Sequence, residues 1–221
     1  MGKFIVIDGL DGSGKETQSL LLEKKLTELG KKVRIISFPM YENDSSLPVR
    51  MYLDGKLGSH PSDTGAYPAS MFFACDRYIS YVTDWKKDIS DPDTLVIANR
   101  YTSANAVHQL SKMEGNEWDY FLKWLWDFEF SKLKLPVPDA IVYLEVAPDV
   151  SLSLIEKRSR ETSRTTDIHE KDKEYMKRCY DAALFSCDKL GWIKITCSNG
   201  GSLRTREDIS NELYEKIKNL L

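Results

Sequence analysis

The sequence lacks several features by which whole classes of protein are recognised. No apolar run approaches the length of a membrane span, and no Pro/Gly/Ser-rich linker, internal repeat or low-complexity tract interrupts the 221 residues. The net charge of −3 provides no broad basic field for nucleic acid. We therefore expect one domain, residues 1–221, with neither a membrane nor a nucleic acid as its partner.

Cysteine and histidine are also sparse and scattered. The four cysteines, Cys75, Cys179, Cys187 and Cys197, show no CxxC spacing, and the three histidines do not cluster. This pattern predicts reduced thiols rather than a disulfide framework or a metal site. An apolar strand pattern begins almost at the N-terminus, so no signal peptide is visible. These features indicate a cytoplasmic protein.

What the chain does contain is a regular alternation of apolar strands and helical patterns. The predicted strands cover residues 3–8, 32–37, 94–98, 140–146 and 192–196. The predicted helices cover residues 15–29, 47–55, 67–87, 104–112, 116–131, 149–158, 168–190 and 204–221. This alternation predicts an α/β fold with a parallel sheet covered on both faces, in which ligands bind at the carboxyl ends of the strands.

A glycine loop joins the first predicted strand to the first predicted helix. Gly9 and Gly14 have the spacing of a phosphate-binding loop, and Lys15 follows directly. The glycines let backbone N–H groups surround an anion, while the helix N-terminus and Lys15 add positive charge. The next residue is Glu16, at a position where Ser or Thr usually binds Mg²⁺. The alternative is a glycine turn that binds no ligand.

Other candidate residues follow a strand or share one face of a helix. Arg100 comes after the third strand, where a guanidinium suits a ligand phosphate or a structural ion pair. Phe73 and Arg77 are four residues apart, so they could stack on a base and hydrogen-bond its edge, or belong to the core. The aromatic helix from Trp118 to Phe128 is predicted to be core or subunit interface.

A polar segment at about 158–170 is the candidate for a lid over a triphosphate. It contains Arg158, Arg160, Arg164, Asp167 and Glu170. An arginine delivered by a lid stabilises charge on a phosphoryl group in transfer. The alternative is a solvated charged loop.

These motifs, in this order, resemble the thymidylate kinase family over nearly the whole chain. The phosphate loop continues into Thr17-Gln18, and Phe38-Pro39 follows the second strand. The remaining matching segments are Phe73–Arg77, Asn99–Tyr101 with Asn105 and Gln109, Pro138-Asp139, Leu144–Pro148, Lys157-Arg158 and the lid residues.

The resemblance implies a P-loop NTPase fold: a five-stranded parallel sheet with helices on both faces, an Arg-rich lid and usually a homodimer. It implies Mg²⁺-dependent transfer of the γ-phosphoryl group of ATP to dTMP, which yields dTDP and ADP. The family takes its catalytic arginine from the phosphate loop or from the lid. Because Ser13 occupies the loop position, the chain resembles the lid-arginine kind.

The resemblance also assigns roles to single residues. The residues implied in catalysis are Lys15, Arg100, Arg160 and Arg164. The residues implied in ATP binding are Gly9, Asp11, Gly12, Ser13, Gly14, Lys15, Glu16 and Thr17. The residues implied in dTMP binding are Asp11, Phe38, Pro39, Tyr41, Phe73, Arg77, Arg100, Asn105, His108, Gln109, Asp167 and Glu170. Asp11 is expected either at the 3′-hydroxyl of dTMP or, with Glu16, near Mg²⁺.

The chain departs from the family pattern at Glu16, Met40, Asn99, Ala104 and His108. Asn99 replaces an aspartate that would help to hold Mg²⁺. We hypothesise that Glu16 supplies this carboxylate, and the alternative is that Glu16 is a tolerated exposed substitution. His108 stands where an aromatic side chain would exclude a ribose 2′-hydroxyl. Two other functions stay open: a nucleoside monophosphate kinase with altered base choice, and a nucleotide-binding regulator without catalysis.

Overall fold

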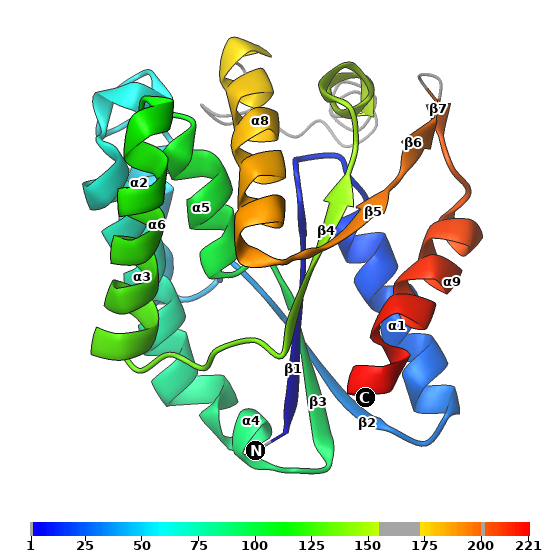
Figure 1. Cartoon of the computed structure of the whole chain (residues 1–221). Coiled ribbons are helices and arrows are strands. Elements are labelled where there is room, and N and C mark those ends of the chain that lie inside the picture. The colour runs from blue at the N-terminus through cyan, green and yellow to red at the C-terminus, as the bar shows by residue number, and fades with distance from the viewer. Residues whose placement is uncertain (1, 155–172, 200–201) are drawn as a thin grey trace.

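The computed structural model describes residues 2–154, 173–199 and 202–221. Its centre is a five-stranded parallel sheet in the order β2-β3-β1-β4-β5 (Figure 1). The strands are β1 (Lys3–Gly9), β2 (Lys32–Ser37), β3 (Thr94–Asn99), β4 (Ala140–Glu145) and β5 (Ile193–Thr196). The predicted sheet is therefore confirmed.

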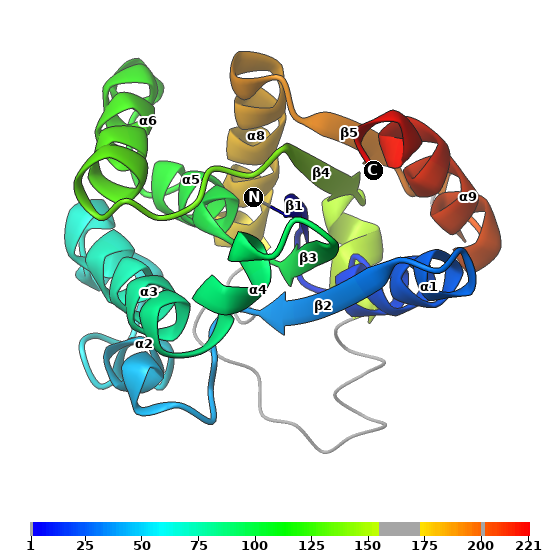
Figure 2. The same ribbon diagram turned by 90° about the horizontal axis from the view of Figure 1, so that it is seen from below.

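Alternate side chains of the central strand enter two separate layers of the core. Ile5 and Ile7 pack with residues of α1 (Lys15–Glu28) and α9 (Arg206–Ile217). Phe4 and Val6 pack with residues of α5 (Thr102–Leu110), α6 (Trp118–Trp126) and α8 (Lys173–Leu190). Successive side chains of a strand point to opposite faces, so an apolar strand needs helices on both sides. Figure 2 shows these two groups of helices on opposite faces of the sheet.

Two of the predicted long helices are interrupted. The predicted helix 67–87 consists of α3 (Ala66–Ser80), a π-helical segment (Tyr81–Trp85) and α4 (Lys86–Ser90). The predicted helix 116–131 consists of a 3₁₀ turn (Gly115–Glu117), α6 and a second π-helical segment (Asp127–Lys132). A π segment inserts a residue without changing the apolar character of the sequence, so hydrophobic periodicity does not reveal it.

The remaining elements are short or incomplete in the described part of the chain. They are α2 (Leu47–Leu53), 3₁₀ turns at Asp44–Ser46, Pro61–Asp63 and Lys218–Leu220, a helical segment at 148–154, and an unpredicted hairpin of β6 (Ser198–Asn199) and β7 (Ser202–Leu203). The predicted lid, 158–170, lies outside the described residues.

The strand order decides where the polar segments meet. In the register of β1 and β3, Ile7 pairs with Asn99, so the glycine loop after β1 lies beside the Arg100 segment after β3. Both segments follow the carboxyl ends of parallel strands, at one edge of the sheet.

Candidate active site

The loop between β1 and α1 has the geometry of an anion-binding turn. Gly9 has a φ of +157°, and a Cβ there would lie 2.5 Å from Ser13 Oγ and 2.7 Å from the Leu144 carbonyl oxygen. Gly14 precedes α1 in the left-handed region, and in the described structure no side chain caps that helix. The first turn of α1 therefore begins at the loop, with its N–H groups where an anion-binding site requires them. Lys15 Nζ donates to the carbonyl oxygens of Gly9 and Leu10, at 2.9 and 2.8 Å.

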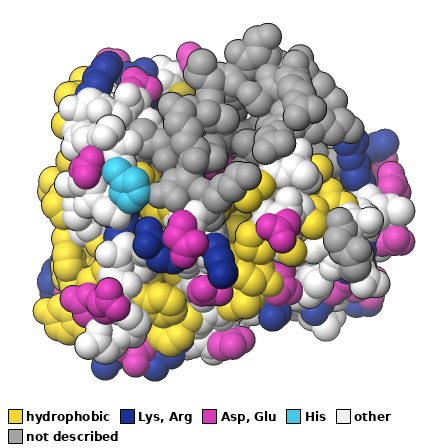
Figure 3. Space-filling view, turned by 90° about the horizontal axis from the view of Figure 1, so that it is seen from above, with side chains coloured by type: hydrophobic (Ala, Val, Ile, Leu, Met, Phe, Trp, Pro, Cys, Tyr) yellow, Lys and Arg dark blue, Asp and Glu magenta, His cyan; other side chains and the backbone are white. Residues whose placement is uncertain are grey.

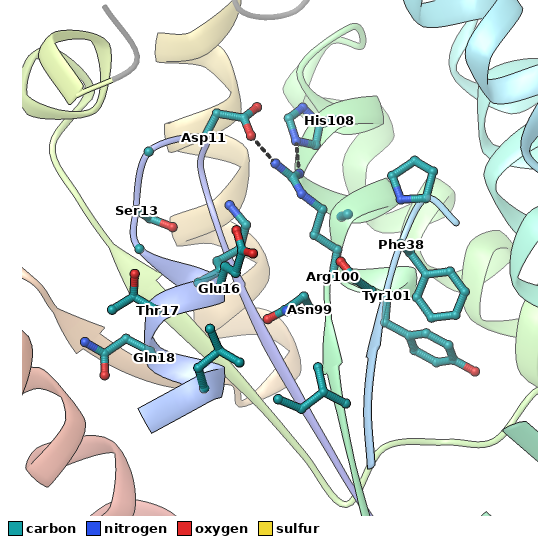
Figure 4. A pocket seen from close by; sticks show the side chains of 18 of the residues that line it. Asp11, Ser13, Glu16, Thr17, Gln18, Phe38, Asn99, Arg100, Tyr101 and His108 are labelled. Carbon is teal, nitrogen blue, oxygen red and sulfur yellow. Dashed lines mark hydrogen bonds and ion pairs between the residues drawn. The ribbon is translucent and has the colours of Figure 1, made fainter. Parts of the chain in front are cut away.

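Arg100 meets this loop from the end of β3. Its backbone N–H donates to Ile7 at 3.0 Å, and its φ of +63° lies in the left-handed region that few side chains adopt. This turn directs the guanidinium toward the loop, where it forms an ion pair with Asp11 and contacts His108 (Figure 4). The side chains of Arg100 and Asp11 are each less than one-fifth exposed.

The surrounding groups keep Arg100 charged and His108 neutral. Burial lowers the pKa of Arg100, but the charge of Asp11 and of further acidic groups, together with the hydrogen bond to Asp11, raises it above its ordinary value overall. Burial and then the charge of Arg100 lower the pKa of His108 to about 3. The site therefore presents a permanent cation, which suits a ligand phosphate, beside a neutral imidazole.

His108 also connects the site to α8. Its Nδ1 lies 3.4 Å from Tyr175 Oη and 3.6 Å from Cys179 Sγ, while Tyr175 Oη donates to the His108 carbonyl oxygen at 3.0 Å. Tyr175 and Cys179 lie on the helix that follows the predicted lid in sequence. The position of Arg100 is thus coupled to that helix.

A second group of predicted residues lines the space between α3 and α5. Phe73 packs edge-on against Tyr52, with ring centroids 6.1 Å apart. Arg77 and Asn105 are buried and line the same cavity. Gln109, one turn beyond Asn105, is 0% exposed, and neither of its amide atoms has a hydrogen-bond partner in the described structure. A buried amide without partners is costly, so Gln109 is suited to a bound molecule.

The segment after β2 closes one side of this space. Phe38-Pro39 is a cis peptide, and the Met40 N–H donates to Asp76 Oδ2 at 2.9 Å. Ser45 Oγ donates to the other oxygen of this buried carboxylate at 2.6 Å. Asp76 therefore positions the segment that presents Tyr41 to the cavity.

One cavity of about 710 Å³ joins the phosphate loop, Arg100, His108 and the space between α3 and α5. Figure 3 looks onto this end of the molecule, where Lys or Arg side chains lie beside Asp or Glu side chains and hydrophobic side chains flank them. The predicted residues that line the cavity are Asp11, Gly12, Ser13, Gly14, Lys15, Glu16, Thr17, Phe38, Pro39, Tyr41, Phe73, Arg77, Arg100, Asn105, His108 and Gln109. Gly9 does not line the cavity, but its conformation shapes the phosphate loop. Arg158, Arg160, Arg164, Asp167 and Glu170 lie outside the described residues.

Comparison with known proteins agrees with this architecture. The model of the family described as thymidylate kinase matches residues 7–209. The chain belongs to the thymidylate kinase family. It is therefore a nucleoside monophosphate kinase by family.

Relatives of this family match most of the chain. A thymidylate kinase of Mycobacterium tuberculosis is 28% identical over 176 residues, covering 79% of this chain and 80% of the relative. A probable thymidylate kinase of Methanococcus maripaludis is 25% identical over 222 residues, covering both chains fully. The solved thymidylate kinase of Candida albicans has a TM-score of 0.69 at 17% identity, covering 99% of this chain and 92% of that one. This last similarity shows the shared fold.

Several residues of this thymidylate kinase site were not found from the sequence. Asp8 accepts from the Gly9 N–H at 2.8 Å and from Ser103 Oγ at 2.5 Å, so it ties the loop to α5. Glu129 pairs with Arg77. A visible signal for Glu129 was its place eight residues after Phe121 and four after Leu125, on a helix face that is otherwise apolar.

The cavity has a further end that the motifs did not indicate. It is lined by Leu20, Leu154, Leu203, Arg204, Arg206 and Ile209. Gln18 Nε2 donates to the Arg206 carbonyl oxygen at 3.0 Å, which joins α1 to α9 at this end. These residues come from separate elements and follow no local pattern.

Proposed function

We propose that the protein transfers the γ-phosphoryl group of ATP to dTMP, giving dTDP and ADP. The observation that carries this proposal is one cavity with two ends that differ in chemistry and meet at the phosphate loop and Arg100. The Phe73 and Gln109 end suits a pyrimidine, and the Leu20 and Arg206 end suits a purine. Two nucleotides bound in this way would have their phosphates adjacent between Lys15 and Arg100.

The charged groups between the two ends suit phosphoryl transfer. The N–H groups at the start of α1 and Lys15 would bind the phosphates of ATP, while Arg100 would bind the phosphate of dTMP. Transfer through a loose transition state depends on positioning and on charge stabilisation, which fixed cations supply. Arg160 or Arg164, from the segment at about 158–170, would complete the positive charge around the transferring group.

Asp11 and Glu16 are the carboxylates that we propose near Mg²⁺. Mg²⁺ is usually held by one or two carboxylates together with substrate phosphates, rather than by an all-protein cage. Glu16 is exposed, lines the cavity and lies beside the loop, and among the described residues no cluster of three acidic, histidine or cysteine ligands exists. This arrangement fits Mg²⁺ bound with ATP. When bound, the ion would neutralise charge on the phosphate oxygens.

We assign the base and sugar of dTMP to the end between α3 and α5. Phe73 would stack on the thymine, and Arg77, Asn105 and Gln109 would contact its polar edge. His108 would lie near the sugar, and Phe38, Pro39 and Tyr41, which line the same cavity, would also contact dTMP. As the alternative to a place near Mg²⁺, Asp11 would bind the 3′-hydroxyl of dTMP. Asp167 and Glu170, in the segment at about 158–170, would also contact dTMP.

The exposed face of α3 supports a homodimer. Met71 and Tyr78 are 52% and 41% exposed, and their spacing of seven residues puts them on one side of α3. Val82, which is 51% exposed, follows in the π-helical segment. An apolar stripe of this kind is suited to a second copy of the chain. Light scattering of wild type and Met71→Glu tests this assembly, since a charge on the stripe should yield monomer.

A cytoplasmic location is also part of the proposal. The four cysteines are free, and three of them are buried, as expected for a reducing compartment. In the part of the chain that the structure describes, no helix is long and apolar enough to span a membrane.

An ADP-release assay with ATP and Mg²⁺ tests the activity, with dTMP, dUMP, dCMP, dGMP and UMP as parallel acceptors. We expect the highest kcat/KM with dTMP and a lower value with dUMP, because one methyl group is worth about 1–3 kcal/mol. Turnover of UMP equal to that of dUMP would show that His108 does not exclude ribose. ATP binding without turnover of any acceptor would overturn the proposal in favour of a silent nucleotide-binding protein.

A further inference from the structure

Glu129 is a fully buried carboxylate behind the base end of the cavity. It lies in the π-helical segment after α6 and is 0% exposed. Hydrogen-bond donors of Arg77, Thr102 and Asn105 converge on its two oxygens. Arg77 and Asn105 line the cavity, whereas Glu129 does not, so Glu129 can act on a ligand only through them.

Glu129 holds Arg77 in one orientation. Nε of Arg77 donates to Oε2 of Glu129 at 2.7 Å, and Nη2 donates to Oε1 at 2.5 Å. Nη1 donates to the Tyr101 carbonyl oxygen at 3.4 Å. A guanidinium has five N–H groups in a planar fork. The N–H groups that remain can only donate, so Arg77 presents donors to the cavity.

Glu129 also decides which way the amide of Asn105 faces. Nδ2 of Asn105 lies 3.1 Å from Glu129 Oε1 and 3.2 Å from the Ser70 carbonyl oxygen, so both amide hydrogens have acceptors. A carboxylate paired with a guanidinium accepts and does not donate, which excludes the flipped amide. Within the described residues, nothing donates to Asn105 Oδ1. Asn105 therefore presents an acceptor to the cavity.

We propose that Glu129 is the positioning residue for base choice, because its carboxylate orients Arg77 and Asn105 to receive a pyrimidine with a 4-keto group and an N3–H. This inference rests on the proposed function and adds the origin of its selectivity. The 4-keto oxygen accepts from Arg77, and the N3–H donates to Asn105 Oδ1. A 4-amino pyrimidine offers a donor to Arg77 and an acceptor to Asn105, so both contacts fail.

The test compares dTMP with 5-methyl-dCMP, because this pair shares the methyl group and differs only at the polar edge. In Glu129→Gln, an NH₂ group replaces one of the two carboxylate oxygens, and both of these oxygens accept from Arg77, so either orientation of the amide turns a donor toward Arg77. If the NH₂ group replaces Oε1, it also faces Asn105 and allows the Asn105 amide to flip. We expect the ratio of kcat/KM for dTMP over 5-methyl-dCMP to fall by about tenfold or more. The KM for ATP should stay within about twofold, since the base contacts lie at the other end of the cavity.

Thr102→Val is the matched control. It removes the hydroxyl that donates to Glu129 Oε2 at 2.6 Å but leaves the contacts of Arg77 and Asn105 in place. If Glu129 serves only folding, both variants should lower the unfolding temperature and keep the wild-type ratio. If Glu129 positions the base contacts, only Glu129→Gln should change the ratio.

A second variant and a binding measurement complete the test. If Glu129→Gln does not fold, Glu129→Asp retains the charge but shortens the reach, and we expect it to lower the same ratio. The Kd values of both nucleotides give the ratio without catalysis, so failure of wild type to phosphorylate dTMP would overturn only the proposed function. An unchanged ratio in folded Glu129 variants, or equal wild-type binding of the two nucleotides, would overturn the role of Glu129.

Discussion

Nη1 of Arg100 lies 3.1 Å from Nε2 of His108. A guanidinium can only donate, so Nε2 of His108 must accept, and the proton of the neutral imidazole is on Nδ1. Nδ1–H then faces Tyr175 Oη and Cys179 Sγ on α8. Arg100 therefore determines the tautomer of His108, and together with burial, which contributes more, it keeps the imidazole neutral.

We expect His108 to make the folded protein less stable as the pH falls. Its pKa is lowered to about 3 by burial and by Arg100, whereas the unfolded chain has the ordinary value. The contribution of neutral His108 to the free energy of unfolding is complete at pH values above the unfolded pKa. It is lost as the pH falls toward the folded pKa, because at pH values between the two pKa values only the unfolded state binds the proton. The loss from pH 7 to pH 5 is about 2 kcal/mol.

Urea unfolding at pH 7 and pH 5 measures this difference. In His108→Gln the pH dependence should shrink by that amount. Val107→Ala is the control, since it removes buried atoms next to His108 without a titrating group and should lower stability equally at both pH values. Full wild-type pH dependence in His108→Gln would show that another group is responsible.

Replacing Arg100 separates its charge from its backbone conformation. Arg100→Ala and Arg100→Asn both remove the cation, so each should lower kcat/KM for the acceptor by about 100-fold or more. Because Arg100 has a φ of +63°, Asn, which tolerates this region, should be more stable there than Ala by about 0.5–1 kcal/mol. Steady-state kinetics and thermal unfolding of the two variants give both quantities. Equal stability would mean that the backbone relaxes once the ion pair with Asp11 is lost.

Gly9→Ala should damage the phosphate loop specifically. The added Cβ would approach Ser13 Oγ and the Leu144 carbonyl oxygen at 2.5 and 2.7 Å, so the loop or β4 must move. We expect ATP affinity, measured by calorimetry, to fall by about tenfold or more, together with a loss of stability. Gly115→Ala is the control, because no atom lies within 4 Å of its Cβ position. Comparable loss of ATP binding in both variants would contradict a local effect.

The parts of the structure that the sequence predicts are those that depend on local pattern. The apolar strands and the glycine loop needed only neighbouring residues, and the parallel order placed Arg100 beside the loop. The contacts of Glu129 could not be predicted in this way. Arg77 and Thr102 are 52 and 27 residues away in sequence, and a π-helical segment determines which way Glu129 faces.

The two interpretations of Phe73 and Arg77, as core residues and as a base-binding pair, both apply to Arg77. The sequence allowed either core residues or a base-binding pair, and the structure places Arg77 in the core with an ion pair while it still lines the cavity. A buried cation requires a partner charge. That requirement, rather than the helix spacing, explains why Glu129 lies behind the base end of the cavity.

Glu16 and Asn99 provide the last prediction, which concerns Mg²⁺. Asn99 Oδ1 accepts a hydrogen bond from Ser19 Oγ, so the amide is held at the end of β3 and carries no charge. Glu16 and Asn99 both line the cavity (Figure 4). If Glu16 supplies the missing carboxylate, Glu16→Ser should raise the Mg²⁺ concentration for half-maximal activity several-fold and weaken calorimetric binding of ATP in the presence of Mg²⁺.

Adding Asn99→Asp to Glu16→Ser restores one carboxylate at this place, and Ser19 can still donate to it, so the double variant should recover most of the Mg²⁺ affinity. Glu28→Ser, at the far end of α1, changes the net charge equally and should leave the Mg²⁺ dependence unchanged, because an exposed charge there is separated and screened from the phosphates. Wild-type Mg²⁺ dependence in Glu16→Ser would show instead that Glu16 is a tolerated substitution and that Asp11 and the nucleotide phosphates suffice to hold the ion.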